Sequence, residues 1–275
     1  MKAKKIGRLA FGVVMWCFGI AYISPLYFVV ANALKSYDQV TLDPVGVPNP
    51  LQFSNFVEAW QGMNYLRAFV NTFLISALSI VGIILVCAMG AYMLVRRNPK
   101  TSKVIYAIII AMMFVPFQAM MIPLVKIASA LHLTNNLAGE IVIYIGCGIP
   151  MAMFLFHGFM MSIPYELEEA AQIDGCSTGR IFFQIVFPQL KSITVTVAIL
   201  DVLWIWNDFL LPIITISQQE LRTLTLSYYF YFGEYVNQWH LALAAVTLSI
   251  IPVIVFYFLG QNYIVEGIAA GAVKG

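Results

Sequence analysis

Long apolar segments alternate with short polar ones along almost the whole chain. A helix needs about 20 residues to cross the roughly 30 Å hydrocarbon core of a bilayer. Six apolar runs reach that length: residues 9–34, 68–95, 104–125, 137–161, 192–216 and 241–265. The pattern therefore predicts an all-α membrane protein with six transmembrane helices.

Composition supports this prediction. Hydrophobic residues make up 61% of the 275 residues and charged residues 10%, whereas soluble domains carry about 25% charged residues. The uncharged run from Leu9 to Leu34 follows a cluster of cations. It is longer than the apolar part of a signal peptide, which has about 7–15 residues, so we expect a retained first span. We expect residues 1–275 to form a single transmembrane domain.

Positive charges are distributed unevenly over the segments between the predicted spans. Cytoplasmic segments of membrane proteins are enriched in Lys and Arg. If the N-terminus is inside, eleven of the 15 Lys and Arg residues are cytoplasmic and four are external. The sequence therefore predicts that both termini are cytoplasmic, together with the loop of residues 162–191 between the fourth and fifth spans.

That loop carries the start and stop signals of two short helices. Ser162, Pro164 and three glutamates predict a helix start, because a cap, an early proline and early acids suit the exposed N–H groups and the positive end of the helix dipole. Gly175 predicts a stop in the left-handed conformation. Ser177 predicts the cap of a second helix, which we expect Pro188 to end.

The first of these helices offers a surface suited to a protein partner. Ala170 and Ala171 provide a low-profile face that a partner's backbone can approach closely, and Leu167 and Ile173 add apolar contact. Three acidic side chains are placed to reach cations of a partner: Glu168, Glu169 and Asp174. A solvated amphipathic helix at the membrane surface is the alternative, and the residue types alone leave both open.

A family resemblance favours the docking surface. The chain carries Glu169-Ala170-Ala171, then Gly175, then Ile185-Val186-Phe187-Pro188. This resembles the signature (EAA) loop of the membrane subunits of ATP-binding-cassette (ABC) importers, in which Glu-Ala-Ala, Gly and Ile-x-Leu-Pro recur at these spacings. The one departure is Phe187 in place of the usual leucine, which bears on local packing. We call residues 162–191 the coupling loop. The resemblance implies that it docks on an ATPase through these residues: Glu168, Glu169, Ala170, Ala171, Asp174, Gly175, Ile185 and Pro188.

The resemblance extends along nearly the whole chain. It includes Trp206-Asn207-Asp208-Phe209 with Pro212, Val115-Pro116-Phe117-Gln118 with Pro123, and the tail from Gly267 to Gly275. These stretches resemble the carbohydrate-uptake branch, and most of all the second, six-span permease of maltose-type sugar importers. The implied fold is the type I, MetI-like architecture of ABC importer permeases.

The implied function is that of a permease subunit of an ATP-driven sugar importer in a bacterial inner membrane. The implied partners are a homologous permease, two cytoplasmic ATPase subunits, an extracytoplasmic sugar-binding protein and the lipid bilayer, without nucleic acid. No GxxxxGK[ST] loop for nucleotide phosphates occurs, so we expect no cofactor, metal or catalytic residue here, with ATP and Mg²⁺ bound by the partners. A permease for glycerol phosphate or another polyol is the alternative.

Polar residues inside the predicted spans are candidates for a transport path, because an intramembrane carboxylate usually faces a cavity or a partner. Asp201 and Asp208 are seven residues apart and so predicted to lie on roughly one helical face. Trp204 and Asn207 neighbour that face, and Gln118 between two prolines is a similar candidate. For the residues of the fifth span the alternative is a structural role, through hydrogen bonds to a sister permease or to a kink near Pro212. For Gln118 the alternative is a kink of the third span between Pro116 and Pro123.

Two other classes of membrane protein fit the sequence less well. A proton-coupled carrier would use the same aspartates, but the short chain shows no inverted-repeat pattern of broken helices. A membrane enzyme is disfavoured by the lack of a catalytic set.

The external segment before the last span is rich in aromatic residues. Seven aromatics occupy the twelve positions from Tyr228 to Trp239. They suit either a belt at the membrane interface or a contact surface for the external binding protein. In the second case the candidate contacts are Tyr228, Tyr229 and Tyr231. The other long external segment, residues 35–67, predicts an ordered loop with a short helix near Phe53–Trp60.

Overall fold

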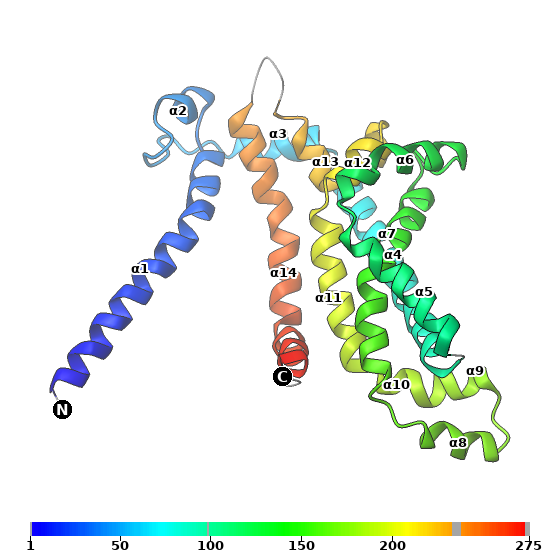
Figure 1. The fold of residues 1–275 in the computed structure, drawn as a ribbon. Coiled ribbons are helices and arrows are strands. Elements are labelled where there is room, and N and C mark those ends of the chain that lie inside the picture. The colour runs from blue at the N-terminus through cyan, green and yellow to red at the C-terminus, as the bar shows by residue number, and fades with distance from the viewer. Residues whose placement is uncertain (1, 98, 233–237, 273–275) are drawn as a thin grey trace. The chain divides into compact units, whose positions relative to one another are not determined.

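The computed structural model describes residues 2–97, 99–232 and 238–272, which form helices joined by loops (Figure 1). The chain divides into two compact units, Met1–Tyr65 with Ser227–Val255 and Leu66–Leu226 with Phe256–Gly275. Among the described residues four helices are long and apolar enough to cross a membrane, or up to six if each of two bent helix pairs is one span. The prediction of an all-α membrane protein is confirmed, while the single domain stays a prediction.

The first unit holds α1 (Lys2–Ala33), α2 (Tyr37–Leu42), α3 (Ser54–Gly62) and the first part of α14 (Trp239–Ala272). Polar side chains of residues 35–65 order this part of the unit through hydrogen bonds to backbone carbonyls. The Asn55 amide donates to the carbonyls of Ala33 and Lys35, both at 2.8 Å. The Tyr65 hydroxyl donates to the Leu248 carbonyl at 3.1 Å. The short helix expected near Phe53–Trp60 is α3, so that prediction is confirmed.

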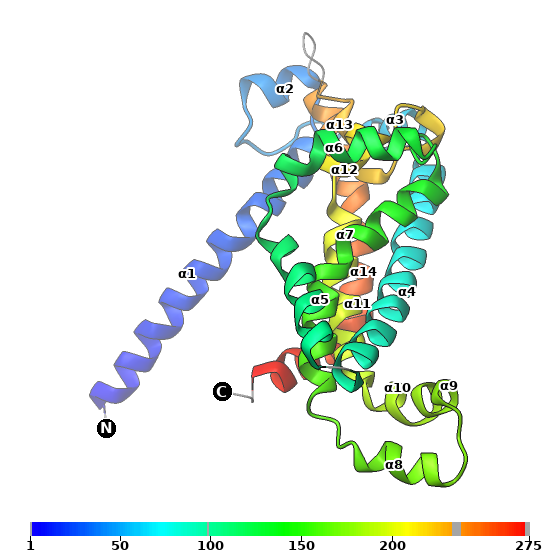
Figure 2. The ribbon, with the colours of Figure 1, turned by 45° about the vertical axis from the view of Figure 1, so that its right-hand side comes forward.

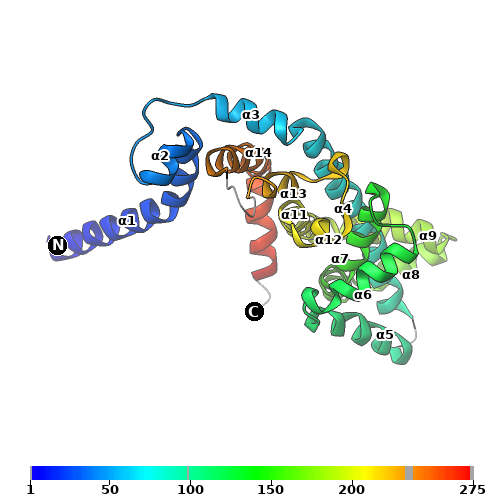
Figure 3. The ribbon, with the colours of Figure 1, turned by 90° about the horizontal axis from the view of Figure 1, so that it is seen from above.

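The remaining helices belong mainly to the second unit, which also includes the end of α14 from Phe256, whereas the last of them is divided between the two units at Leu226–Ser227. In chain order they are α4 (Tyr65–Arg96), α5 (Pro99–Ala111), η1 (Met112–Phe114), α6 (Phe117–Ala130), α7 (Leu137–Met160), α8 (Glu166–Ile173), α9 (Thr178–Ile181), the π-helical η2 (Phe182–Val186), α10 (Phe187–Gln189), α11 (Lys191–Asn207), α12 (Leu210–Thr215), η3 (Gln219–Leu221) and α13 (Leu224–Tyr229). Within it α7 contacts both α5 and α11 and lies between them, as Figure 3 shows from above.

Close packing of α4 on α7 depends on small residues. A Cβ at Gly148 would lie 2.5 Å from Cδ1 of Ile83, and one at Gly90 would lie 2.7 Å from Cε of Met153. Small residues at helix contacts let two backbones approach closely in membranes. The Ser79 hydroxyl also donates to the Ile141 carbonyl at 3.4 Å. These contacts join α4 and α7 along much of their length.

The predicted third span, residues 104–125, is not one continuous helix. The helical segments Lys100–Phe114 and Phe117–Ala130 meet at an angle of 109°. Val115 takes an extended conformation, with φ −86° and ψ 116°, because the residue before a proline is disfavoured in the helical region. The expected kink is therefore a sharp break at Val115–Pro116.

The predicted fifth span, residues 192–216, is also interrupted. The helix α11 ends at Asn207, and Asp208 leaves the helical region with φ −70° and ψ 136°. Oδ1 of Asp208 accepts a hydrogen bond from the Leu210 amide at 3.0 Å, at the start of α12. Asp201 and Asp208 are thus joined by continuous helix, and the chain leaves the helical path only at the second aspartate. The expectation that they share roughly one helical face stays a prediction.

Candidate functional site

The coupling loop forms one end of the second unit, where α8, α9 and α10 lie beyond the end of α7 (Figure 2). The first helix, α8, begins at Glu166 after Tyr165, which makes no side-chain cap bond. The expected cap, Ser162, instead donates to the Phe159 carbonyl at 2.7 Å, and Pro164 precedes the helix. The acids in the first turn are confirmed, and they favour this helix start through the dipole.

Gly175 joins the two arms of the coupling loop, of which the first is α8 and the second consists of α9, η2 and α10. Its φ is +78°, in the left-handed region that glycine adopts without steric cost. The amides of Gly175 and Cys176 donate to the carbonyls of Gln172 and Ala171, each at 3.0 Å, which satisfies the last turn of α8. The predicted glycine stop is confirmed.

The second arm starts and ends close to the expected positions. The Arg180 amide donates to the Ser177 hydroxyl at 3.4 Å, so the cap of α9 is confirmed. The helix then passes through the π-helical segment into α10, in which Pro188 occupies the first turn. The helix ends at Gln189, one residue after Pro188, and a bend of 74° follows before α11, so the predicted end is confirmed to within one residue.

The outer face of α8 is open. Ile173 is 86% exposed and Leu167 is 44% exposed, and Glu169 and Ala170 are exposed beside them. Ala171 faces inward and is buried, so only Ala170 of the alanine pair contributes to a low-profile outer surface. The open face combines one small, two apolar and one acidic side chain.

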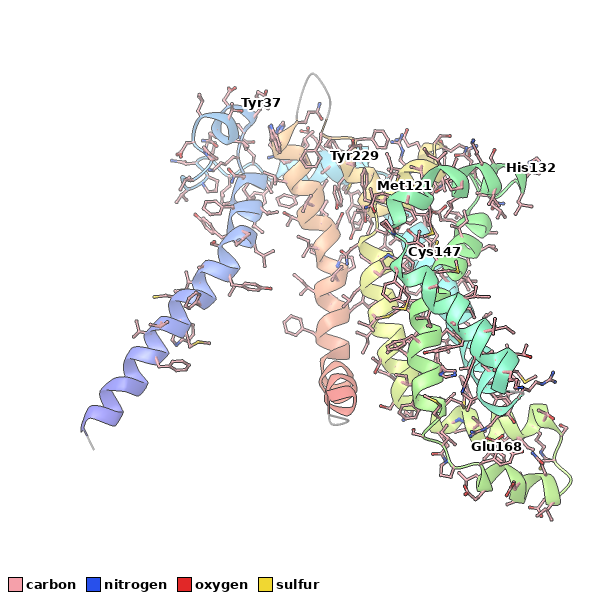
Figure 4. All side chains as sticks on the ribbon, viewed as in Figure 1. Tyr37, Met121, His132, Cys147, Glu168 and Tyr229 are labelled. Atoms are coloured by element: carbon pink, nitrogen blue, oxygen red, sulfur yellow. The ribbon has the colours of Figure 1, made fainter. Side chains whose placement is uncertain are left out.

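Glu168 points the other way. It is 1% exposed, and its carboxylate accepts hydrogen bonds from Arg96 Nε at 2.7 Å and the Tyr92 hydroxyl at 2.9 Å. Figure 4 labels Glu168 in the coupling loop. The expectation that Glu168 reaches a cation of a partner is corrected, because its cation belongs to α4 of the same chain.

An aromatic cluster fills the second arm. The Phe187 ring lies 5.8 Å from that of Phe182 and 6.4 Å from that of Phe183, measured between centroids. Phe182 is buried, Ile185 is half-buried and Pro188 is exposed. Phe187, the one departure from the expected motif, thus takes part in a ring cluster that a leucine would not complete.

The candidate path residues occupy different environments. Asp201 is 5% exposed, and its Oδ2 has no hydrogen-bond partner among the described residues. Trp204, Asn207 and Gln118 are exposed. Asp208 is half-buried, and its Oδ2 accepts a hydrogen bond from the Tyr144 hydroxyl at 3.0 Å.

The sequence analysis did not identify two residues of α7, Tyr144 and Glu140, as part of the candidate path. The Tyr144 ring packs edge-on to Trp204 with centroids 5.6 Å apart. Glu140, one turn before Tyr144 on α7, is 1% exposed. An acidic residue in an otherwise apolar run was the available signal for Glu140, whereas nothing in the sequence pattern marked Tyr144.

The aromatic segment before α14 is only partly exposed. Tyr229 is 42% exposed, but the Tyr231 hydroxyl donates to the Ala59 carbonyl at 3.3 Å within the first unit. Burial, and to a lesser extent the charge of Glu58, raise the pKa of Tyr231. Tyr228 is half-buried. Tyr231 therefore holds α3 in place, and the part of this segment from 233 to 237 lies outside the described residues.

Comparison with known proteins gives a consistent result. The model of the family described as "Binding-protein-dependent transport system inner membrane component" matches residues 80–269. The probable starch degradation products transport system permease protein AmyC of Thermoanaerobacterium thermosulfurigenes is 40% identical over 93% of both chains. The melibiose/raffinose/stachyose import permease protein MelC of Bacillus subtilis is 36% identical over 93% of this chain and 92% of its own.

A solved structure shows the same fold. It is a chain of a bacterial ABC transporter involved in the import of the acidic polysaccharide alginate, 22% identical to this one. The match has a TM-score of 0.81 and covers 96% of this chain and 98% of that chain. The expected permease architecture is confirmed by this match.

Proposed function

This chain belongs to the family of binding-protein-dependent transport system inner membrane components, and on that premise we propose that it forms half of a sugar path and receives the force of ATP hydrolysis through its coupling loop. It is a permease of an ABC sugar importer. The other half of the path comes from a homologous permease. The coupling loop docks on one of two cytoplasmic ATPase subunits, which bind ATP and Mg²⁺.

The observation that carries this proposal is the open face of α8. A helix of eight residues is too short to be stable by itself, and here one side is fixed to the protein while the other offers Ile173, Leu167, Glu169 and Ala170. Apolar side chains with an acid at the rim suit a protein groove lined by cations. A solvated surface helix would not need an 86% exposed isoleucine at its end.

The exposed polar residues of the second unit support a path shared with a second permease. Trp204 and Asn207 are exposed on α11, and Gln118 is exposed at the start of α6. Sugar hydroxyls are met by amide groups, and sugar C–H faces pack on aromatic rings. We propose that these three side chains line the path, while the buried Asp201 and the bonded Asp208 shape it.

The substrate is a short oligosaccharide in this proposal. The names of AmyC and MelC refer to starch degradation products and to melibiose, raffinose and stachyose. Uptake of glycerol phosphate or another polyol is the alternative, and competition of raffinose against glycerol 3-phosphate in an uptake assay separates the two.

An external binding protein delivers the sugar, with Tyr228 and Tyr229 as candidate contacts. In the inner membrane both termini are cytoplasmic, and the tail, whose residues 273–275 lie outside the described part, reaches the ATPases.

A cross-linking experiment tests the docking of α8. In a variant whose four cysteines are replaced by alanine, Ile173→Cys should form a cross-link with the co-expressed ATPase subunit. Gln219→Cys is the matched control, because it is also exposed but belongs to a predicted external segment. ATP-driven uptake by the assembled complex is measured in parallel. A complex that transports sugar without any cross-link from Ile173→Cys would contradict the proposal.

A further inference from the structure

Arg96, the last residue of α4, reaches three points of the coupling loop. Its Nε donates to Glu168 Oε1 at 2.7 Å, and its Nη2 donates to the Ile163 carbonyl at 2.9 Å. The guanidinium carbon lies 5.4 Å from the centroid of the Tyr165 ring. A guanidinium is a planar fork with five donors, so a single side chain can make all of these contacts at once.

Tyr92 reinforces the same connection from one turn earlier on α4. Its hydroxyl donates to Glu168 Oε2 at 2.9 Å, and its ring lies 5.3 Å from that of Phe182 in the second arm. Residues four apart share a helical face. One face of α4 therefore holds both arms of the coupling loop, α8 through Glu168 and η2 through Phe182.

The pair is shielded from water. The side chains of Arg96 and Glu168 are 15% and 1% exposed, whereas the neighbouring Arg97 is exposed. A surface ion pair contributes little to stability. Removing one partner of a buried pair lowers stability far more, because it leaves the other charge buried without a counter-charge. The contact between Arg96 and Glu168 is thus a firm connection.

The connection closes a ring of elements. The chain runs from α7 directly into α8, and α4 packs on α7 through Gly148 and through the bond from Ser79 to Ile141. With Arg96 in place, α8 is attached to α7 covalently and to α4 by the ion pair. A displacement of α8 then moves both helices together.

We propose that Arg96 and Tyr92 form a clamp that locks α8 to the cytoplasmic end of α4, so that force on the coupling loop moves α4 and α7 as one body. This inference rests on the proposed function and adds the positioning residues that transmit the motion. Without the clamp, α8 still docks on the ATPase but tilts on the segments 161–165 and 174–177 that join it to α7 and α9. ATP hydrolysis then continues while less sugar is moved for each ATP.

The test uses the complete transporter in proteoliposomes and measures the sugar transported per ATP hydrolysed. Arg96→Ala should lower this ratio about tenfold or more, on the scale of an uncompensated buried charge. Arg97→Ala removes the same side chain one residue later and should leave the ratio unchanged. Tyr92→Phe keeps the ring against Phe182 and should give a smaller decrease of the ratio. Arg96→Lys keeps the charge but lacks the planar guanidinium, and it should give an intermediate decrease.

Two further measurements distinguish a failure of the clamp from a failure of α8 to dock on the ATPase. Arg96→Ala combined with Glu168→Ala should be no worse than Arg96→Ala alone, because residues in one pair are not additive. The cross-link from Ile173→Cys to the ATPase should persist in the Arg96→Ala background. An intact cross-link with an unchanged transport ratio overturns the clamp only, whereas loss of the cross-link in the parent protein overturns the docking itself. If Arg96→Ala does not assemble, unchanged ratios for both Tyr92→Phe and Arg96→Lys overturn the clamp.

Discussion

Adjacent residues of the coupling loop have opposite roles at the residue scale. Glu168 and Glu169 have the same chemistry, yet one is buried against Arg96 and the other is exposed. Successive helical positions are about 100° apart, so a short helix packed on one side must separate them. Gly175 then decides where the second arm goes, because its positive φ turns the chain.

The residue-scale prediction compares two glycines of this loop. A Cβ at Gly175 or Gly179 would meet nothing within 4 Å, but only Gly175 has a positive φ. An ordinary side chain in that conformation costs about 1–2 kcal/mol, and a β-branched one more. Gly175→Val should therefore strongly reduce sugar uptake at normal protein levels, while Gly179→Val should have a smaller effect. Equal uptake by both variants would show that the turn at Gly175 is not needed for coupling.

At the scale of elements, the helices are interrupted close to the positions to which we assign a function. The chain leaves the helix at Val115–Pro116 and again at Asp208, and a π-helical segment, of a kind frequent at functional sites, interrupts the second arm of the coupling loop. Backbone groups freed by such breaks need partners in a membrane. Asp208 supplies one to the Leu210 amide, and Tyr144 fixes the orientation of its carboxylate.

The element-scale prediction concerns the hydrogen bond from Tyr144 to Asp208. Tyr144→Phe removes the hydroxyl that donates to Asp208 and should lower stability by about 1 kcal/mol, within the range found for interhelical hydrogen bonds in membrane proteins. The matched control is Tyr106→Phe, since the Tyr106 ring stacks on His157 and its hydroxyl makes no hydrogen bond to the residues that the structure describes. Thermal unfolding of the purified protein in detergent measures both variants. A control as destabilised as Tyr144→Phe would argue against a role for the bond to Asp208.

Orientation in the membrane is a property of the whole molecule. Eleven of 15 cations fall on the segments that we expect inside, and the coupling loop must lie on that side to meet an ATPase. The clamp links the ends of two spans, because Arg96 ends the second span and contacts the loop that follows the fourth span. The ends of these two spans therefore lie on the same side of the membrane.

The whole-molecule prediction is a labelling pattern in intact cells. In the cysteine-free variant, Arg97→Cys and Ser177→Cys should react only with reagents that enter the cytoplasm, since both positions are exposed on the predicted inner side. Asn49→Cys and Gln219→Cys should react with an impermeant maleimide from outside. Labelling of Ser177→Cys by the impermeant reagent would reverse the proposed orientation and with it the docking of the coupling loop.

The sequence by itself determined the fold class, the spans without internal breaks and the joint at Gly175. Each depends on local physics: an apolar run long enough for a bilayer must be helical to satisfy its own backbone, and a glycine at a helix end permits the left-handed turn. Pro116 likewise marked a kink from sequence alone. The resemblance of the coupling loop to the importer signature was also readable from residue types at fixed spacings.

Only the tertiary structure decided which way the side chains of these elements face. Glu168 looked like a docking residue and Arg96 like a mere marker of orientation, yet 72 positions apart in the chain they form one buried pair. Tyr144 and Asp208, 64 positions apart, were equally unlinked in the sequence. Periodicity defines the faces of one helix, but the partner of each face depends on how helices distant in sequence pack together, and that is a non-local property.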